Sequence, residues 1–364
     1  MIIDRYLIRE ILQTFLAVML VLLLIFMGRF FAFYLADAAA GEISGGVVLD
    51  LLLLQTLGSL NMMLPFALYI SILLAFGRLY KDNEMTALAA SGVTISRIMV
   101  SVFMIAFGFS VVVGVVALWI SPWADNQRTL IITESEKISL MEGVLPGQFN
   151  QLGKRKDAVF YVEELSEDRK QLNNVFAQIQ TDGKMDVFSA NKGYQYRDPE
   201  TGDRFLVLVD GFRYQGNPGE QNFLIQEYKK NAIRIVEPKV SGKPRRNSSA
   251  PTTQLMSVFK PKEQAELQWR ISMPIATLLL ALLGVLISRT SPRQGRFAKL
   301  FLAILIYIIY NNVMSIARSW IEQNKIPVEV GIWWVHLFAF GLIALMLYYQ
   351  ASGRRLRLKP VFGK

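Results

Sequence analysis

The chain has 364 residues, of which 52% are hydrophobic and only 19% are charged, and its mean hydropathy is +0.33. A soluble domain has about 25% charged residues, so the composition excludes an ordinary soluble enzyme. The net charge of +10 does not indicate nucleic-acid binding, because the surplus lies in the last hundred residues, where 12 basic and 3 acidic side chains flank apolar runs. Cysteine is absent, which excludes disulfides, thiolate metal sites and a cysteine nucleophile.

Apolar segments of membrane-spanning length recur along the chain. Six uncharged runs of at least 18 residues lie at 11–28, 51–77, 98–124, 271–288, 300–317 and 330–353. About 20 apolar residues cross a bilayer as a helix, so we expect six transmembrane helices, three before and three after a polar insertion. The first run is longer than the 7–15 apolar residues of a signal peptide, which favours an uncleaved first helix over a cleaved leader.

Lysine and arginine gather on one side of the expected membrane. The N-terminus, 78–97, 289–299 and the tail after 353 hold 14 basic residues, whereas the opposite short loops hold only Arg318 and Lys325. Because cytoplasmic loops are the basic ones, both termini are predicted to be cytoplasmic. The expected domains are 1–124, with a cytoplasmic helix near 81–91, an extracytoplasmic insertion at 125–264, and 265–364 with a basic cytoplasmic tail.

The insertion has the pattern of a β domain. Short runs rich in β-branched and aromatic residues alternate with turn signals. These runs are 159–162, 175–179, 204–209 and 232–236. Many short strands predict a sandwich, a jelly roll or an open barrel, so the fold class expected is an α+β membrane protein. The composition from Ser241 to Thr253 predicts a mobile linker, and 261–270 predicts a short amphipathic helix that leads into the fourth span.

The sequence contains no catalytic constellation. His336 is the only histidine, so neither a His-based triad nor a two-histidine metal site can form, and its place beside Trp333 and Trp334 is typical of a packing residue at the membrane interface. No Gly-Lys pair is followed by Ser or Thr, so a phosphate-binding P-loop is also missing. If this chain takes part in transport that uses ATP, another polypeptide must bind the ATP. We expect neither a metal nor a cofactor in this chain.

Two arginines lie at the expected outer ends of helices, Arg29 in the first and Arg318 in the fifth. Each has two interpretations. The side chain either extends to the interface and keeps its charge in water, or its guanidinium binds a phosphate group bidentately. Both arginines are therefore candidate contacts for an anionic substrate.

The cytoplasmic segment 80–92 predicts a short helix. Asp82 or Asn83 can cap its start and Gly92 can end it. An isolated helix of this length is marginal, so it needs support either from its own bundle and the lipid headgroups or from a partner protein.

The same segment is a candidate docking site for a partner protein. In a helix, Met85, Leu88 and Ala89 share one face and would form an apolar knob for a groove in the partner. Glu84 lies beside this knob in the first turn, where a carboxylate also favours the helix dipole. Asp82 is the other acidic residue expected at this contact.

Four stretches of the sequence resemble the YjgP/YjgQ family of permeases. They are Met1-Ile-Ile-Asp-Arg-Tyr-Leu-Ile-Arg-Glu10, the Glu84 segment with Ala90-Ser-Gly92, Glu266-Leu-Gln-Trp-Arg270 and Ser291-Pro-Arg-Gln-Gly-Arg296. The resemblance extends over the whole chain, as three helices, a β domain and three helices. The first and last stretches are more similar to the LptF branch of the family than to the LptG branch.

This resemblance implies a permease subunit of an ABC-type exporter of lipopolysaccharide in the inner membrane of a Gram-negative bacterium. It implies a heterodimer of LptF-like and LptG-like permeases, two copies of an LptB-like ATPase and a single-pass LptC-like protein. The insertion would be a periplasmic β-jellyroll that passes lipopolysaccharide to a protein bridge. It also implies that Glu84 meets a basic residue of the ATPase, and that Arg29 and Arg318 lie near lipid A phosphates.

Other functions stay open at this point. An LptG-like subunit of the same exporter is the nearest alternative. A membrane enzyme acting on a lipid or glycan would use carboxylates such as Asp37, Glu42 or Asp50, although nothing in the sequence holds them as a pair. A structural scaffold with a periplasmic domain is the third possibility, and co-purification with an ATPase would separate the transporter from the last two.

Overall fold

The computed structural model divides the chain into two compact units. The helical unit comprises residues 1–30, 53–127 and 245–364, and the sheet unit comprises 31–52 and 128–244. The residues that the structure describes are 2–39, 43–142, 146–151, 158–166, 171–181, 184–197, 204–216, 224–235, 247–288 and 296–351.

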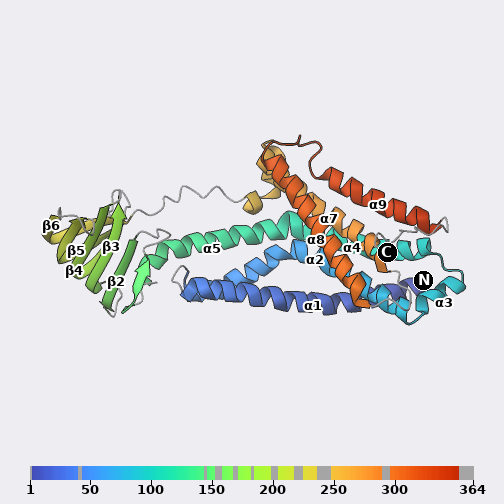
Figure 1. Cartoon of the computed structure of the whole chain (residues 1–364), viewed down its shortest axis with the longest axis horizontal. Helices are drawn as coiled ribbons and strands as arrows, with labels where there is room; N and C mark the ends of the chain where they lie inside the picture. Colours follow the sequence, from blue (N-terminus) through green and yellow to red (C-terminus); the bar gives the residue numbers. More distant parts are fainter. Residues whose placement is uncertain are drawn as a thin grey trace, which may run out of the picture. The chain divides into compact units, whose positions relative to one another are not determined.

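Long helices carry most of the described chain (Figure 1). The N-terminal helices are α1 (Ile2–Ala39), the 3-10 turn η1 (Gly45–Val47), α2 (Val48–Lys81), α3 (Glu84–Ala90), α4 (Ile95–Val115), the π-helix η2 (Val116–Ile120) and α5 (Ser121–Glu142). The C-terminal helices are the 3-10 turn η3 (Asn247–Ser249), α6 (Thr252–Ser257), α7 (Pro261–Ser288), α8 (Arg296–Glu322) and α9 (Trp333–Ala351).

Five helical segments in the described part of the chain are long and apolar enough to cross a membrane. They are Ile2–Ala39, Gly45–Lys81, Ile95–Glu134, Pro261–Ser288 and Leu300–Glu322. The sixth predicted span coincides with a shorter apolar helix, Trp333–Tyr349. Its 17 residues extend about 26 Å at 1.5 Å per residue, a little less than the thickness of a bilayer core, so the number of six spans stays a prediction.

α7 is the central helix of the helical unit and packs against α4, α8 and α9. Two sites along it bring backbones close together. Ser110 of α4 donates a 2.9 Å hydrogen bond to the carbonyl of Pro274, and Gly114 lies opposite the Pro274 ring. Gly284 faces the ring of Tyr69 in α2, where a Cβ would be 3.3 Å away. The predicted amphipathic helix at 261–270 and the fourth span are one continuous helix, since α7 contains both.

The sheet unit contains a six-stranded antiparallel sheet in which every strand pairs with its neighbours in sequence. The strands are β1 (Phe149–Gln151), β2 (Ala158–Leu165), β3 (Gln171–Thr181), β4 (Lys184–Arg197), β5 (Arg204–Gly216) and β6 (Leu224–Ile235). One face is apolar and buried, with Val162, Val175, Phe188 and Leu208 in its core. This order is a meander, and the predicted jellyroll remains a prediction.

Each of the strands β2 to β6 has one residue that is left out of the backbone pairing. The backbone pairing skips Glu163 in β2, Asn174 in β3, Asn191 in β4, Asp210 in β5 and Lys229 in β6. All five side chains are exposed. The skipped residues of neighbouring strands lie opposite each other, and the register is the same on both sides of them. The five positions therefore form a single row across the sheet, which we call the crease.

The crease changes which residues face inward. Strand side chains ordinarily alternate with a period of two, but the inward residues Leu172 and Val175 are three positions apart, as are Leu208 and Gly211. Asn174 and Asp210 have positive φ angles of 51° and 53°, a conformation that Asn and Asp adopt more readily than other side chains. Unpaired residues of this kind bend a strand, so the sheet bends along the crease.

Gly211 is required by the close approach of β4 and β6 beside the crease. A Cβ on Gly211 would lie 2.1 Å from the carbonyl oxygen of Ser189 and 2.9 Å from the Cα of Ala190. Tyr228 covers the same spot and donates a 3.2 Å hydrogen bond to the Ser189 carbonyl. Burial raises the pKa of the Tyr228 phenol above its usual range, so this donor stays protonated at neutral pH.

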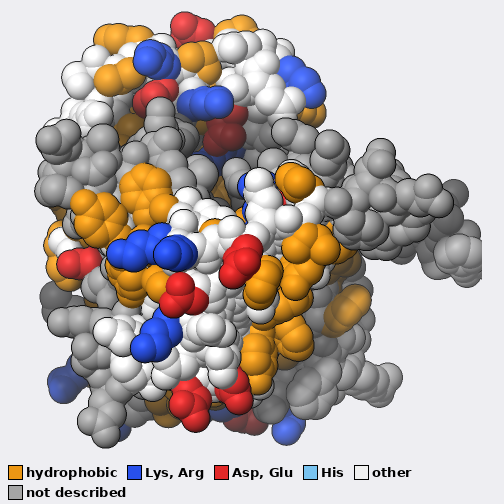
Figure 2. Space-filling model, turned by 90° about the vertical axis from the view of Figure 1, so that its left-hand side faces the viewer, with side chains coloured by type: hydrophobic (Ala, Val, Ile, Leu, Met, Phe, Trp, Pro, Cys, Tyr) orange, Lys and Arg blue, Asp and Glu red, His pale blue; other side chains and the backbone are white. Residues whose placement is uncertain are grey.

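Exposed hydrophobic side chains also occur on the strands. On the face drawn in Figure 2, hydrophobic side chains lie in patches among lysine, arginine, aspartate and glutamate side chains. Exposed aromatic and aliphatic residues of the strands include Phe149, Tyr196, Phe212, Tyr214, Leu224 and Ile225.

One expectation about the returning chain is wrong. Part of the segment predicted as a mobile linker, 241–253, is ordered: residues 247–249 form η3, and Thr252 begins α6. Ser249 and Thr252 are buried because they pack onto the start of α7. Residues 241–246 lie outside the described residues, as does Glu42.

Candidate functional site

The helix predicted in segment 80–92 is present as α3, and α1 holds it in place. Tyr6 of α1 donates a 2.5 Å hydrogen bond to Oε2 of Glu84. Arg78 at the end of α2 forms a 2.8 Å ion pair with Glu10 of α1. Asp4 accepts hydrogen bonds from Arg97 and Ser101 of α4, at 2.7 and 2.5 Å. The start of α1 therefore connects α2, α3 and α4 at one end of the helical unit (Figure 1).

The ends of α3 are set by backbone geometry. Asn83 occupies the N-cap position with a φ of 60° and makes no side-chain cap, so the predicted capping by its side chain is wrong. Gly92 has a φ of +89° and ends the helix as predicted. The amide of Val93 bonds to the Leu88 carbonyl and that of Gly92 to the Ala89 carbonyl, which is a Schellman motif. α3 is therefore a defined element rather than a frayed loop.

The apolar face of α3 points inward. Met85 is only 5% exposed and belongs to the same buried cluster as Leu79, Ile98 and Met99, and Leu88 packs against that cluster. The bundle itself therefore buries Met85, whereas Leu88 is half-buried, and a contact of these two residues with a partner stays a prediction. Asp82, Thr86, Ala87, Ala89 and Ala90 are exposed, and Glu84 is half-buried. These residues form the solvent-facing side of α3 and of the turn before it.

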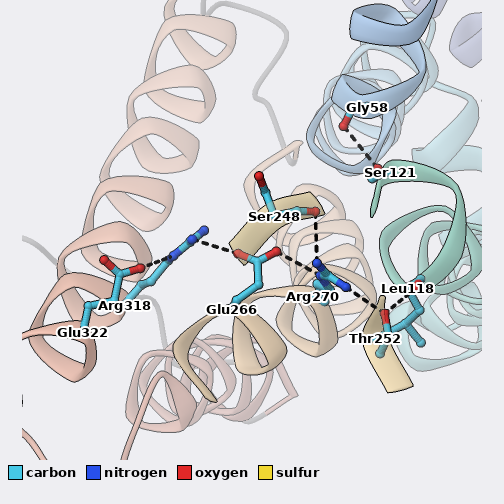
Figure 3. Close-up of polar contacts among 9 residues, drawn as sticks. All are labelled: Gly58, Leu118, Ser121, Ser248, Thr252, Glu266, Arg270, Arg318 and Glu322. Carbon is cyan, nitrogen blue, oxygen red and sulfur yellow. Dashed lines mark hydrogen bonds and ion pairs between the residues drawn. The ribbon is translucent and has the colours of Figure 1, made fainter. Parts of the chain in front are cut away.

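A second polar site lies at the start of α7, where Glu266 pairs with two arginines (Figure 3). Its Oε1 accepts a 2.9 Å hydrogen bond from Nε of Arg270, and its Oε2 lies 2.8 Å from Nη2 of Arg318. Arg318 also bonds to Glu322 at 2.9 Å, and its guanidinium lies 5.3 Å from the centre of the Trp269 ring. Two carboxylates thus neutralise two arginines in a site that is largely removed from solvent.

Arg270 is the most buried member of this network, with 2% of its surface exposed. It donates to Glu266, to the hydroxyl of Thr252 at 2.8 Å and to the carbonyl of Ser248 at 3.1 Å. Thr252 in turn donates to the carbonyl of Leu118 in η2. A buried guanidinium is tolerated only when its donors are satisfied, and here the partners come from three separate segments.

The two arginines predicted to bind substrate have different surroundings. Arg29 is exposed on α1, and within the described part of the chain no carboxylate pairs with it. Arg318 is already held by Glu266, Glu322 and Trp269, so a lipid phosphate would have to displace a carboxylate from it. The structure does not bring Arg29 and Arg318 into contact with each other.

Those of the remaining candidate residues that the structure describes form no reactive cluster. His336 is buried in α9 and its Nδ1 lies 2.8 Å from the hydroxyl of Tyr310, as expected for a packing residue. Asp37 is half-buried and Asp50 is exposed. Among the described residues, no three His, Asp or Glu side chains are placed to hold a metal ion.

Sequence reasoning missed the roles of Tyr6, Thr252 and Arg270. The partner of Tyr6 is 78 residues away, and no local pattern reveals such a pair. A weak signal existed for Arg270, because Glu266 and Arg270 are four residues apart, and on a helix this spacing places a carboxylate and a guanidinium side by side. Both lie in a stretch that the family resemblance had already singled out.

Comparisons with known proteins identify the family of the chain. The family model described as "Lipopolysaccharide export system permease LptF/LptG" matches residues 5–350. The chain is 29% identical over 363 residues to lipopolysaccharide export system permease protein LptF of Escherichia coli K12, covering 98% of each protein, and the Shigella flexneri protein of that name matches equally. With nearly its whole length matched, the chain belongs to the LptF/LptG family of lipopolysaccharide export permeases.

Proposed function

We propose that this chain is the LptF-type permease subunit of an ABC exporter, which extracts lipopolysaccharide from the outer leaflet of the inner membrane and passes it to a periplasmic bridge. The observation that carries the proposal is the family match over residues 5–350, together with helices long enough to span a membrane. An LptG-like role in the same exporter is the alternative. The greater similarity of the N-terminus to LptF favours the first assignment, as do the relatives named LptF.

Because the sequence has no P-loop, the proposed exporter requires a separate ATPase. We infer that the exposed face of α3 contacts it. Glu84 is oriented by Tyr6, and Met85 anchors α3 to the bundle, so a push on the outer face is passed to α1, α2 and α4. Two copies of an LptB-like ATPase, an LptG-like permease and an LptC-like protein are the partners this proposal requires.

Exposed apolar side chains on the strands suit the acyl chains of the proposed substrate. Phe212, Leu224 and Ile225 are exposed, and covering acyl chains with apolar side chains removes them from water. Arg29 is the better candidate for a phosphate contact, because its guanidinium is exposed whereas that of Arg318 is neutralised by two carboxylates. No cofactor is needed for either role.

Purification of the full-length chain from its native membrane tests the exporter. We expect an ATPase and a second permease to co-purify with it, and in nanodiscs we expect ATP-dependent release of lipopolysaccharide to a soluble acceptor. Release that proceeds without ATP, or a chain that purifies without any ATPase, would contradict the proposal. Lipid or glycan turnover by the chain alone would instead support the membrane-enzyme alternative.

Reporter fusions test the proposed orientation, with both termini cytoplasmic and the sheet unit periplasmic. A reporter that is active only in the periplasm should be active after Lys229 and silent after Arg293 or Lys364. The basis is the excess of Lys and Arg in the segments assigned to the cytoplasm. Activity at the C-terminus would overturn the six-helix topology.

A further inference from the structure

Leu118 lies at a break in the hydrogen bonding between α4 and α5. In an α-helix its carbonyl would accept from the amide of residue 122, but that residue is Pro122, which has no N–H. The backbone responds with the π-helix η2, Val116–Ile120. π-helices are rare and often mark functional positions. The carbonyl of Leu118 therefore cannot receive the bond of a regular α-helix, and a side-chain donor from another segment stabilises it.

Thr252 donates a side-chain hydrogen bond to the Leu118 carbonyl. Its hydroxyl also accepts a hydrogen bond from Nη1 of Arg270, and the residue is 8% exposed. Thr252 is the first residue of α6, shortly after the chain re-enters the helical unit at residue 245. Leu118 precedes the point at which α5 leaves that unit, after residue 127. Leu118 therefore lies on the outgoing connection, where the chain leads into segment 128–244. Thr252 lies on the returning connection, where the chain comes back from that segment.

Arg270 joins these connections to the central helix. The guanidinium of Arg270 donates to the side-chain hydroxyl of Thr252 and to the backbone carbonyl of Ser248. Both residues lie on the returning connection. Glu266 neutralises it, and Arg318 of α8 meets the other oxygen of Glu266. Figure 3 shows the chain of contacts from Glu322 through Arg318, Glu266, Arg270 and Thr252 to Leu118. Nearby, Ser121 donates to the carbonyl of Gly58, which ties the start of α5 to α2.

We propose that Thr252 and Arg270 are positioning residues of a clamp that holds both connections of segment 128–244 to α7. Through this clamp, movement of the membrane helices reaches the outgoing and returning connections together. The transport part of this inference rests on the proposed exporter function. The existence of the clamp does not, because the contacts alone define it.

The chain offers a matched set of variants at adjacent threonines. Thr252→Val removes the hydroxyl at nearly constant volume, Thr252→Ser retains it, and Thr253→Val makes the same change at an exposed neighbour. We would measure amide hydrogen exchange of residues 252–257 in the full-length chain, purified in nanodiscs with its co-purifying subunits. Exchange should accelerate roughly tenfold in Thr252→Val, the factor expected when a buried carbonyl loses its donor. Thr252→Ser and Thr253→Val should match the unaltered protein.

The same samples report on coupling. In Thr252→Val, ATP hydrolysis should stay within about twofold, while lipopolysaccharide transfer to a soluble acceptor falls roughly fivefold, at the low end of measured couplings between sites. Transfer should return to normal in Thr252→Ser. Equal exchange in Thr252→Val and Thr253→Val would overturn the clamp, and faster exchange with undiminished transfer would overturn its coupling role. If the unaltered complex transfers no lipopolysaccharide, the exporter function and the coupling role are both wrong. The amide hydrogen exchange of residues 252–257 then still tests whether the clamp exists.

Discussion

The hydroxyl of Tyr6 donates a 2.5 Å hydrogen bond to Oε2 of Glu84, although 78 residues separate them in sequence. The bond joins the first turns of α1 to the first residue of α3. A carboxylate that accepts such a bond has a restricted side-chain orientation. The orientation of the Glu84 carboxylate is therefore already restricted in the chain by itself, which favours the proposed contact with a basic group on another protein.

We expect Glu84→Ala to weaken binding of the ATPase and Glu84→Arg to weaken it further. Loss of one partner of a desolvated charge pair costs about 2–5 kcal/mol, much of it from the charge left behind. ATPase recovered with the purified chain and ATP hydrolysis in nanodiscs measure the effect. Tyr6→Phe is the control, because it removes the hydrogen bond but keeps the carboxylate, and its loss should be smaller.

A compensating Arg→Glu change in the ATPase should partly restore export by Glu84→Arg. This rescue distinguishes a direct charge pair from a general disturbance of α3. Normal export and normal ATPase recovery with Glu84→Arg would show that α3 is not the coupling element.

The two faces of α3 should respond differently to substitution. Met85→Ala removes a buried side chain from the helical core and should lower the free energy of unfolding by about 2–5 kcal/mol, seen as a lower melting temperature. Ala89→Glu lies on the exposed face and should leave the melting temperature unchanged while it reduces ATPase recovery. If Met85→Ala left stability intact but abolished ATPase binding, Met85 would face the partner after all.

Gly211→Ala should destabilise the sheet unit by about 3 kcal/mol or more, because the new Cβ would meet backbone atoms of β4 that cannot move independently. Gly193→Ala is the graded control: its closest neighbour is a side-chain methyl of Val175 at 3.2 Å, which can shift. Protease resistance and thermal unfolding of the full-length chain measure both. Equal stability of the two variants would contradict the close approach at Gly211.

Arg29→Glu should reduce photocrosslinking to lipopolysaccharide more than Arg29→Lys does, since a charge-assisted contact to phosphate contributes about 1.5–3 kcal/mol. ATPase assembly should persist in both variants. Arg9→Glu, an equally exposed arginine near the other end of α1, controls for the change in charge. Equal crosslinking by all variants would mean that Arg29 only extends to the membrane interface.

The regular elements were largely predictable because their signals are local. Every described long apolar helix coincides with a predicted uncharged run, and the runs at 159–162, 175–179 and 204–209 lie inside β2, β3 and β5. β4 was missed, because Lys184 to Arg197 carries charged and polar residues on its exposed positions. The crease also interrupts the alternation of apolar and polar residues by which a strand is recognised in a sequence, because two consecutive residues face outward at the crease.

The sites were predictable only in part because their contacts are distant in sequence. Glu84 and Gly92 have local signals for a helix start and stop, and both lie where expected. Whether Met85 faces a partner or its own core depends on helices far away in sequence. Likewise, Arg318 had the pattern of a free cation at a membrane interface, and only the fold shows that Glu266, 52 positions earlier, neutralises it.

The crease also constrains how the length of this chain can change during evolution. Pairing is in register on both sides of it, so deleting one residue there from a single strand would turn half of that strand inside out. Apolar side chains would then face water and polar ones the core. Insertions and deletions among relatives should therefore fall in the turns between strands, whereas the row from Glu163 to Lys229 can be lost only from all five strands together.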